Sequence, residues 1–473
     1  MTDMTLAQQL GAFASAVRSG GAPADVRASV RMRILDIVGL QLAATGLDTS
    51  RAALDFVASQ GGSGQAHTVG LSDPLPATWA AFAGGVLAHS LDYDDTHLPS
   101  VLHPSASVVP AALAVAEAQQ ASGALLQDAV GVGIEVVVRL GMAGYDLTTR
   151  NSLFFEHGQH ATSICGAMGA AVASAMLLDL DEAGITNALA VAASMASGIL
   201  EANRTGGTVK RLHCGWAAHA GVTAATMVKH GFTGAPTALE GRFGFFEAFL
   251  HDEIDPEVVV GGLGEDWSVP GIFFKPYPAN HFTHAGIDAA RRMRDAGVTP
   301  DVVASAVLGV AGPTVRTIGQ PLEVKQAPDT GYQAQFSGPY TVAAGLFGGS
   351  GLGVGLDDFT DALACDPNRR LLMSKVTVEA DADCEAIYPF QFPAVLTLRT
   401  TDGSTLVERV MVNRGGPEDP LSTDELRVKY TENATRVLDA GTAADIAGMV
   451  GQLDHVPDVR ALCSGLAHPA ATS

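Results

Sequence analysis

The sequence predicts a mainly α-helical protein, in which an all-helical domain is formed by both chain ends and a smaller α+β lid domain is inserted between them. The chain of 473 residues is too long for one hydrophobic core, so two domains are expected. Its 53 Gly and its low aromatic content of 6% favour closely packed helices. Alternating β-branched runs begin only after Lys275, which places the β-structure late in the chain.

Apolar residues with helical spacing dominate the first part of the chain. The N-terminal segment places four such residues on one face: Leu6, Leu10, Phe13 and Val17. Further helices are predicted at 105–120, 161–178, 183–201 and 215–230. Gly231 stands where the last of these needs a C-terminal cap. The longest apolar stretches are short and rich in Ala and Gly, so they indicate buried helices rather than membrane spans.

The smaller domain is predicted at 273–413. Its strands are expected at 302–310, 373–380, 394–400 and 405–412. Asp402-Gly403 between the last two is a strong hairpin signal. After the Gly- and Pro-rich break at 414–420, Ser422 and Glu425 form a capping box that starts a helix. We therefore expect residues 414–473 to rejoin the helical domain of residues 1–272.

Charge and cysteine content exclude several classes of partner. The formal net charge of −22 argues against nucleic acid and anionic membranes, which attract Lys- and Arg-rich surfaces. The five cysteines are scattered without CxxC spacing, which is typical of a reducing compartment. The N-terminus has no basic segment of a signal peptide. A cytoplasmic protein is expected, with a small molecule as its ligand.

Ionisable residues concentrate in four segments, 91–107, 150–163, 203–219 and 273–286. Nine of the fourteen histidines lie in or directly beside them. Such clustering predicts one shared site.

The first two segments offer an acid and a base. His103 precedes Pro104-Ser105, where a helix begins, so backbone N–H groups would lie beside it and could receive a carboxylate. The alternative is that His103 and Asp92 only tether the loop. His160 could transfer a proton near neutral pH, or it could be a buried histidine bound to a carbonyl. His157 and His160 are three residues apart, but no third ligand follows, so no metal site is expected.

The other two segments offer lysines. Lys210 follows the Gly-rich turn 205–208 but lacks phosphate-loop spacing, which leaves a carboxylate anchor or a solvated lysine as its interpretations. Lys275 precedes the stiff Pro276-Tyr277-Pro278 turn, close to His281, at the predicted domain junction. Clefts between domains often bind ligands, although this turn could also be a plain hinge.

In this order the motifs resemble those of the MmgE/PrpD family, which contains 2-methylcitrate dehydratase, cis-aconitate decarboxylase and iminodisuccinate epimerase. The matching motifs run along nearly the whole chain: D-x-D-D-T at 92–96, HPS at 103–105, G-x-H at 158–160, the Gly-Thr and lysine at 207–210, ALEGRFGFF ending at 246, K-x-Y-P at 275–278 and P-L-S-x-x-E-L-x-x-K at 420–429.

The resemblance implies a lyase that needs no cofactor and forms a homodimer. It implies a pocket lined by Asp92, Thr96, His103, His160, Lys210 and Lys275. We also expect His281, which follows the K-x-Y-P turn, to bind the substrate. We expect His103 and His160 to act as acid and base. Asp92 is expected to orient a histidine, Thr96 to hydrogen-bond the substrate, and Lys210 and Lys275 to hold its carboxylates.

Two departures from the decarboxylase pattern argue against decarboxylation of cis-aconitate, and within the family we expect a hydro-lyase acting on a small di- or tricarboxylate. Asn280 stands where the decarboxylases have a histidine, with His281 beside it, and Thr317 or Ile318 replaces a tyrosine. An epimerase, isomerase or decarboxylase of a related polycarboxylate is the alternative within the family.

Two other functional classes share features with this sequence. A class II terpene cyclase also uses D-x-D-D, but this chain has few aromatic residues to line such a cavity. A non-catalytic carboxylate-binding protein is the remaining alternative.

Overall fold

The computed structural model describes residues 4–146, 148, 151–202, 207–251 and 254–467. Its internal contacts divide the chain into two compact units. Unit 1 comprises Met1–Ile272 and Tyr430–Ser473, and unit 2 comprises Phe273–Lys429. Unit 2 thus extends sixteen residues beyond the end predicted at 413, into the helix that follows the Gly- and Pro-rich break.

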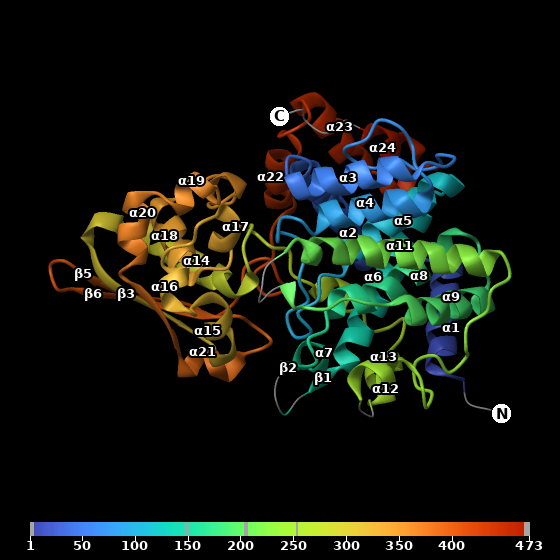
Figure 1. Cartoon of the computed structure of the whole chain (residues 1–473), viewed down its shortest axis with the longest axis horizontal. Helices are drawn as coiled ribbons and strands as arrows, with labels where there is room; N and C mark the ends of the chain where they lie inside the picture. Colours follow the sequence, from blue (N-terminus) through green and yellow to red (C-terminus); the bar gives the residue numbers. More distant parts are fainter. Residues whose placement is uncertain (1–3, 147, 149–150, 203–206, 252–253, 468–473) are drawn as a thin grey trace. The chain divides into compact units, whose positions relative to one another are not determined.

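Unit 1 is a helical body that carries one two-stranded ribbon (Figure 1). Its elements before residue 273 are α1 (Leu6–Gly20), α2 (Ala24–Ala44), α3 (Asp48–Gln60), α4 (Ala77–Ala88), α5 (Ser105–Gln119), α6 (Gly123–Ala143), β1 (Tyr145–Asp146), β2 (Asn151–Ser152), α7 (Leu153–Glu156), α8 (Ala161–Leu177), α9 (Glu182–Met195), α11 (Val209–Lys229), α12 (Phe245–Leu250), α13 (Pro256–Val260) and η1 (Val269–Gly271). After unit 2 the chain adds α23 (Ala440–Gly451), η5 (Leu453–His455) and α24 (Arg460–Gly465).

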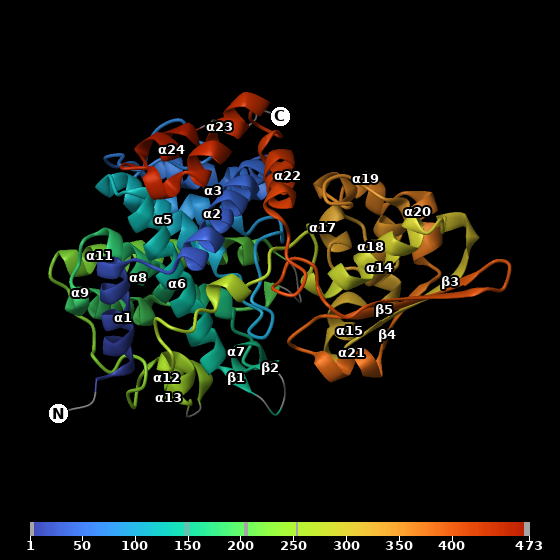
Figure 2. The same cartoon turned by 180° about the vertical axis from the view of Figure 1, so that it is seen from behind.

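Helix α8 lies at the centre of unit 1, and every one of its residues is buried. It packs against α5, α6, α9 and α11. The C-terminal elements close the same core, since α23 packs on α2 and α24 on α5 (Figure 2). Because α8 is built almost entirely from small and apolar residues, several helices can approach it on all sides.

Glycines allow α4 and α11 to lie in close contact. A Cβ atom added to Gly85 of α4 would lie 2.6 Å from the carbonyl oxygen of Cys214, and one added to Gly215 of α11 would lie 2.5 Å from that of Phe82. Both obstacles are backbone atoms, which cannot rotate away. The absence of two side chains therefore fixes the distance between these helices.

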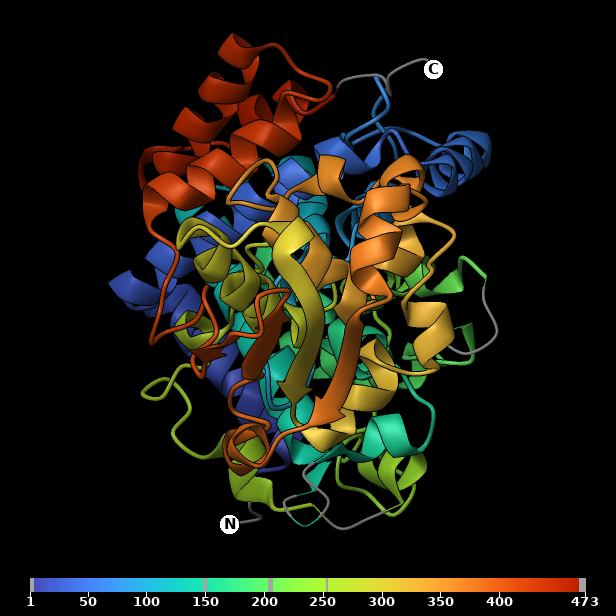
Figure 3. The same ribbon diagram turned by 90° about the vertical axis from the view of Figure 1, so that its left-hand side faces the viewer.

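Unit 2 combines short helices with a four-stranded sheet (Figure 3). Its elements are η2 (His281–Thr283), α14 (His284–Asp295), η3 (Pro300–Val302), β3 (Val303–Val310), α15 (Gly312–Ile318), α16 (Leu322–Lys325), α17 (Gly331–Ala334), α18 (Gly338–Phe347), η4 (Leu356–Asp358), α19 (Asp361–Ala364), α20 (Pro367–Met373), β4 (Val376–Ala380), α21 (Ala382–Ile387), β5 (Ala394–Thr400) and β6 (Thr405–Val410). Helix α22 (Thr423–Ala434) leads from unit 2 back into unit 1.

The sheet has the strand order β4-β3-β5-β6. Strands β3 and β4 are parallel, whereas β5 is antiparallel to both β3 and β6. Residue Arg399 pairs with Thr405 across the turn that contains Asp402-Gly403. Gly403 has a φ of 91°, a left-handed conformation that glycine adopts without strain.

The mainly helical class is confirmed, and so are all four predicted strands, with ends shifted by at most three residues. Two helix boundaries were wrong. Helix α9 ends at Met195, because Ala196 is extended, and α11 begins at Val209 rather than at 215. Lys210 and Arg211 give the first turn of α11 no apolar pattern, so helical spacing did not predict it. The capping box is confirmed, since the Ser422 hydroxyl accepts from the N–H of Glu425 and the Glu425 carboxylate accepts from that of Ser422.

No helix in the described part of the chain is long and apolar enough to cross a membrane.

Candidate active site

The loop that follows α4 is fastened to the body of unit 1 through Asp95. The guanidinium of Arg33, on α2, donates to Asp95 Oδ2 at 2.7 Å, and both side chains are buried. Ser105 donates to the same carboxylate with its hydroxyl at 2.5 Å and its N–H at 3.2 Å. Arg33 also donates to the carbonyl oxygens of Val269 and Ile272. This buried pair fixes the loop against the start of α5.

Asp92 has an unusual backbone conformation and binds a lysine from a distant helix. Its φ of 52° is left-handed, a conformation that Asp tolerates better than most residues. Its Oδ1 accepts from Lys210 Nζ, on α11, at 3.1 Å. The Lys210 side chain keeps 16% exposure, whereas the Asp92 side chain keeps 4%. Asp92 thus holds the lysine near the loop.

Two histidines face Asp94. The Nδ1 atom of His89 lies 2.7 Å from Asp94 Oδ2, and the Nδ1 atom of His103 lies 3.9 Å from the same oxygen. His103 Nδ1 also lies 2.7 Å from the carbonyl oxygen of Asp95 and 3.4 Å from Thr96 Oγ1. A carbonyl only accepts, so His103 carries a hydrogen on Nδ1, and Nε2 is the ring nitrogen that can gain or lose a proton.

A second histidine pair lies beside the first. The Nδ1 atoms of His160 and His213 are 2.8 Å apart, so one ring donates and the other accepts. The centroid of the His89 ring lies 5.3 Å from that of His103 and 5.7 Å from that of His160. The two pairs therefore form one cluster of four imidazoles, His89, His103, His160 and His213, which we call the histidine cluster.

Burial and neighbouring charge keep part of the cluster neutral. Burial lowers the pKa of His160 well below its ordinary value, and the nearby His89, His213 and Lys210 lower it further. Burial, then His89 and Lys210, lowers the pKa of His213 to about 4. Both rings are therefore uncharged at neutral pH, the form in which an imidazole nitrogen can accept a proton.

Helix ends bring these side chains together. His103 lies two residues before α5, His160 is the N-cap of α8, and Lys210 lies in the first turn of α11. Within the described residues, the N-cap side chains of His160 and Thr208 accept no hydrogen bond from the first backbone N–H groups of their helices. Peptide N–H groups and positive dipole ends at helix starts favour an anion.

Lys275 and His281 belong to unit 2 and are both buried. The His281 ring lies 4.5 Å from that of His284 and contacts Phe273 and Phe392 edge-on. The turn between them is held through Tyr277, whose hydroxyl donates to Asp288 Oδ1 at 2.5 Å. That Lys275 and His281 share one pocket with the residues of unit 1 stays a prediction.

Of the predicted site residues, the structure brings together the five in unit 1: Asp92, Thr96, His103, His160 and Lys210. Sequence reasoning assigned the orientation of a histidine to Asp92, whereas the carboxylate that binds a histidine ring at 2.7 Å is Asp94. His157 is exposed and faces the carbonyl oxygen of Phe249. The first half of the predicted 205–208 turn lies outside the described residues.

Four contributors were missed: Arg33, His89, Asp94 and His213. His213 lies three residues after Lys210, a spacing that would have placed it on the same helical face had α11 been predicted from Val209. Arg33 lies two residues after Arg31 and three before Asp36, so the sequence of α2 does not single it out as a site residue.

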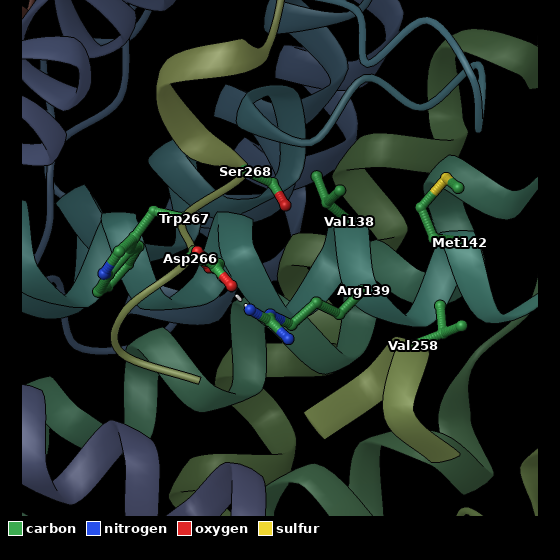
Figure 4. Close-up of a pocket in the computed structure, with 7 residues that line it drawn as sticks. All are labelled: Val138, Arg139, Met142, Val258, Asp266, Trp267 and Ser268. Atoms are coloured by element: carbon green, nitrogen blue, oxygen red, sulfur yellow. Dashed lines mark hydrogen bonds between the residues drawn. The ribbon is translucent and has the colours of Figure 1, made fainter. Parts of the chain in front are cut away.

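A separate hollow of about 400 Å³ lies on α6, α13 and the segment before η1 (Figure 4). Its lining shares no residue with the histidine cluster. Arg139 is the basic residue in this lining, and its guanidinium donates to Glu135 Oε1 and to the carbonyl oxygens of Gly261 and Asp266. Its guanidinium thus serves to hold the 259–268 segment on α6.

Known proteins similar to this chain identify its family. Residues 8–257 match the MmgE/PrpD N-terminal domain, and residues 277–455 match the MmgE/PrpD C-terminal domain. Cis-aconitate decarboxylase of Mus musculus is 30% identical over 94% of this chain and 90% of its own length. Cis-aconitate decarboxylase of Homo sapiens is 31% identical over 84% of this chain and 80% of its own length. That of Aspergillus terreus is 25% identical over 95% of this chain and 93% of its own length. The chain belongs to the MmgE/PrpD family.

Proposed function

We propose that this protein is a lyase of the hydro-lyase type, which acts on a small di- or tricarboxylate by histidine-based proton transfer alpha to a carboxylate. The observation that carries the proposal is the histidine cluster: four imidazoles grouped where α5, α8 and α11 begin, with Lys210 beside them. Family membership and decarboxylase relatives support a polycarboxylate substrate.

In this proposal a neutral histidine removes the proton alpha to a substrate carboxylate. Negative charge then builds on that carboxylate, where Lys210, Lys275 and the helix N–H groups lower the barrier. The hydroxyl on the adjacent carbon leaves with a proton from the second histidine, so that an alkene and water are formed. His160, which burial keeps neutral, suits the base, and His103 suits the acid. Thr96 hydrogen-bonds the substrate or holds His103.

Decarboxylation is the second candidate, because the curated relatives named above are cis-aconitate decarboxylases. In that reaction the bond from carbon to a carboxylate breaks, carbon dioxide leaves, and a histidine protonates the resulting carbanion. Both reactions need the same cations and imidazoles. The geometry of the histidine cluster is therefore compatible with each.

A turnover screen tests these proposals. The purified protein is incubated in deuterated water with cis-aconitate and with citrate-like, malate-like and aspartate-like acids, and the products are read by mass spectrometry. Loss of water supports the hydro-lyase, loss of carbon dioxide supports the decarboxylase, and deuterium uptake without either would indicate an epimerase. Each reaction is repeated with a chelator, because the proposal invokes no metal. Binding without any turnover would favour a carboxylate-binding protein and contradict the proposal.

We also propose that the protein is a homodimer. Helix α11 exposes three large apolar side chains at helical spacing, Val209, Leu212 and Trp216, which we call the α11 stripe. Each is between 37% and 39% exposed, and Ile199 is 65% exposed. Contiguous exposed apolar side chains are typical of an association surface. A second copy on the α11 stripe would cover the helix that carries Lys210 and His213.

A further inference from the structure

His89 and Asp94 are two members of the site to which the proposed reaction assigns no role. His89 follows the last residue of α4, and the side chains of both residues have no exposed surface. A carboxylate only accepts, so the 2.7 Å contact shows that His89 carries a hydrogen on Nδ1. Among the described residues, none forms a hydrogen bond with His89 Nε2.

The carboxylate oxygen that His89 binds also faces His103. Asp94 Oδ2 lies 3.9 Å from His103 Nδ1, within the range at which an opposite charge favours the protonated form. His103 has 11% side-chain exposure, whereas Asp94 has none. The buried carboxylate therefore lies near the Nδ1 atom of a histidine that is itself partly exposed.

The other carboxylates around His103 are paired with Arg or Lys, and two of the neighbouring histidine rings are neutral. Arg33 from α2 pairs with Asp95, and Lys210 from α11 pairs with Asp92. His160 from α8 and His213 from α11 are neutral because burial lowers the pKa of each. Asp94 differs from Asp92 and Asp95 because the partner that binds it at 2.7 Å is a histidine.

We propose that His89 is a positioning residue, which holds Asp94 ionised beside His103 and thereby enables His103 to keep the proton that the reaction transfers. This inference deepens the proposed lyase function and rests on it. Loss of the Nδ1 hydrogen bond would make the buried Asp94 bind a proton more readily. A neutral Asp94 no longer favours a proton on His103, so the pKa of His103 falls.

Three variants separate this role from simple packing. His89→Leu removes the donor, Asp94→Asn removes the charge, and His89→Asn keeps an N–H group near the position of Nδ1. The pKa of His103 is measured by NMR on protein with labelled histidine rings, and its signal is identified by its loss in His103→Asn. We expect the pKa to fall by about one unit or more in the first two variants and to stay unchanged in His89→Asn.

The double variant tests whether His89 acts through Asp94. If it does, His89→Leu with Asp94→Asn lowers the pKa of His103 no further than Asp94→Asn alone, because the effects of coupled residues are not additive. An additive fall, an unchanged pKa or a raised pKa in a folded His89→Leu variant would overturn the proposal. Circular dichroism checks folding, and His89→Gln replaces the leucine variant if that variant does not fold.

The titration needs no turnover, so it is independent of the lyase proposal. A substrate screen without product together with the expected fall in pKa would refute the lyase and leave the coupling standing. Where turnover is measured, the alkaline limb of the pH profile of kcat/KM, which reports the general acid, should move to lower pH in His89→Leu by the same amount as the pKa of His103. A uniform loss of kcat at every pH would indicate a merely structural role and count against the proposal.

Discussion

At the scale of single residues, the site is a set of individually paired charges. Asp92, Asp94 and Asp95 follow one another closely, yet each has a different partner: Lys210, His89 and Arg33. Removal of one partner leaves a buried carboxylate uncompensated, which is far more costly than loss of a surface pair. Substitutions in this loop should therefore be designed to preserve charge or hydrogen bonding.

His103→Asn is expected to lower kcat by about 10²- to 10⁴-fold, the usual contribution of a general acid or base. The asparagine amide can still donate to the Asp95 carbonyl, but it cannot transfer a proton from the position of Nε2. His103→Ala should abolish turnover and leave folding intact. His157→Asn is the matched control, because His157 is exposed and contacts the carbonyl oxygen of Phe249 and the ring of His251, neither of which belongs to the histidine cluster. Turnover of His103→Asn equal to that of the control would refute the assignment.

Folding stability should decrease as the pH falls from about 6.5 to about 4. Burial lowers the pKa of His213 and that of His97 to about 4, whereas the unfolded chain keeps the ordinary value of 6.5. Between these limits the unfolded chain binds protons that the folded protein does not, so the stabilisation is full above 6.5 and is lost towards 4. Urea unfolding across this range measures it. His213→Asn should flatten the profile, and a flat wild-type profile would contradict the prediction.

Single residues were predictable from the sequence where a motif marked them. His103, His160 and Lys210 stand beside helix starts or turns, which local sequence reveals. His89 and Asp94 are five residues apart, and the structure alone shows that their side chains meet. The contact between His160 and His213 joins two helices that are distant in the chain, and no local pattern encodes it.

At the scale of helices, the site depends on how closely α4 and α11 approach. Helix α4 ends beside His89, and α11 carries Lys210 and His213. Gly85 and Gly215 set the distance between these helices. A change in this spacing would move the histidine rings of the two helices apart, since the helices themselves are rigid.

Gly85→Ala is expected to destabilise the protein by about 1–3 kcal/mol, as overpacking of a core does, and to reduce turnover. The new Cβ would lie 2.6 Å from the Cys214 carbonyl oxygen and 2.7 Å from the Gly215 Cα. Gly448→Ala, in α23, is the matched control because no atom lies within 4 Å of its added Cβ. That change should be neutral or stabilise by about 0.5–1 kcal/mol. Denaturant unfolding compares them, and equal effects would show that the contact is not tight.

The elements themselves were largely predictable, because alternation and helical spacing are local. All four strands and the Asp402-Gly403 hairpin followed from such patterns. The start of α11 was missed because a helix that begins with charged site residues lacks an apolar face there. The short helices of unit 2 between β3 and β4 are four to ten residues long, too short for a clear period.

At the scale of the whole molecule, both ends of the chain contribute to unit 1. Helix α23 packs on α2, α24 on α5 and η5 on α6. A Cβ on Gly123, at the start of α6, would lie 2.2 Å from the carbonyl oxygen of Leu453, so the C-terminal segment fits closely. The mainly helical class followed from composition, whereas the end of unit 2 at Lys429 depends on contacts that composition does not encode.

Trp216→Asp should convert the proposed homodimer into a monomer. A carboxylate in the middle of the α11 stripe would be buried without a partner, which is unfavourable by several kcal/mol per dimer. Sedimentation velocity measures the mass. Leu371→Asp, which changes a 62% exposed leucine of α20, is the control and should leave the mass unchanged. A wild-type protein that sediments as a monomer would refute the homodimer.

The division of unit 1 between the two ends of the chain has a consequence for synthesis in the cell. While Phe273–Lys429 is being translated, the surfaces of α2 and α5 that later receive α23 and α24 have no partner. At about 5–20 residues per second this interval lasts roughly ten to thirty seconds. Nascent chains on ribosomes stalled before Tyr430 should therefore be more readily cleaved by protease, and more readily bound by chaperones, than the released protein.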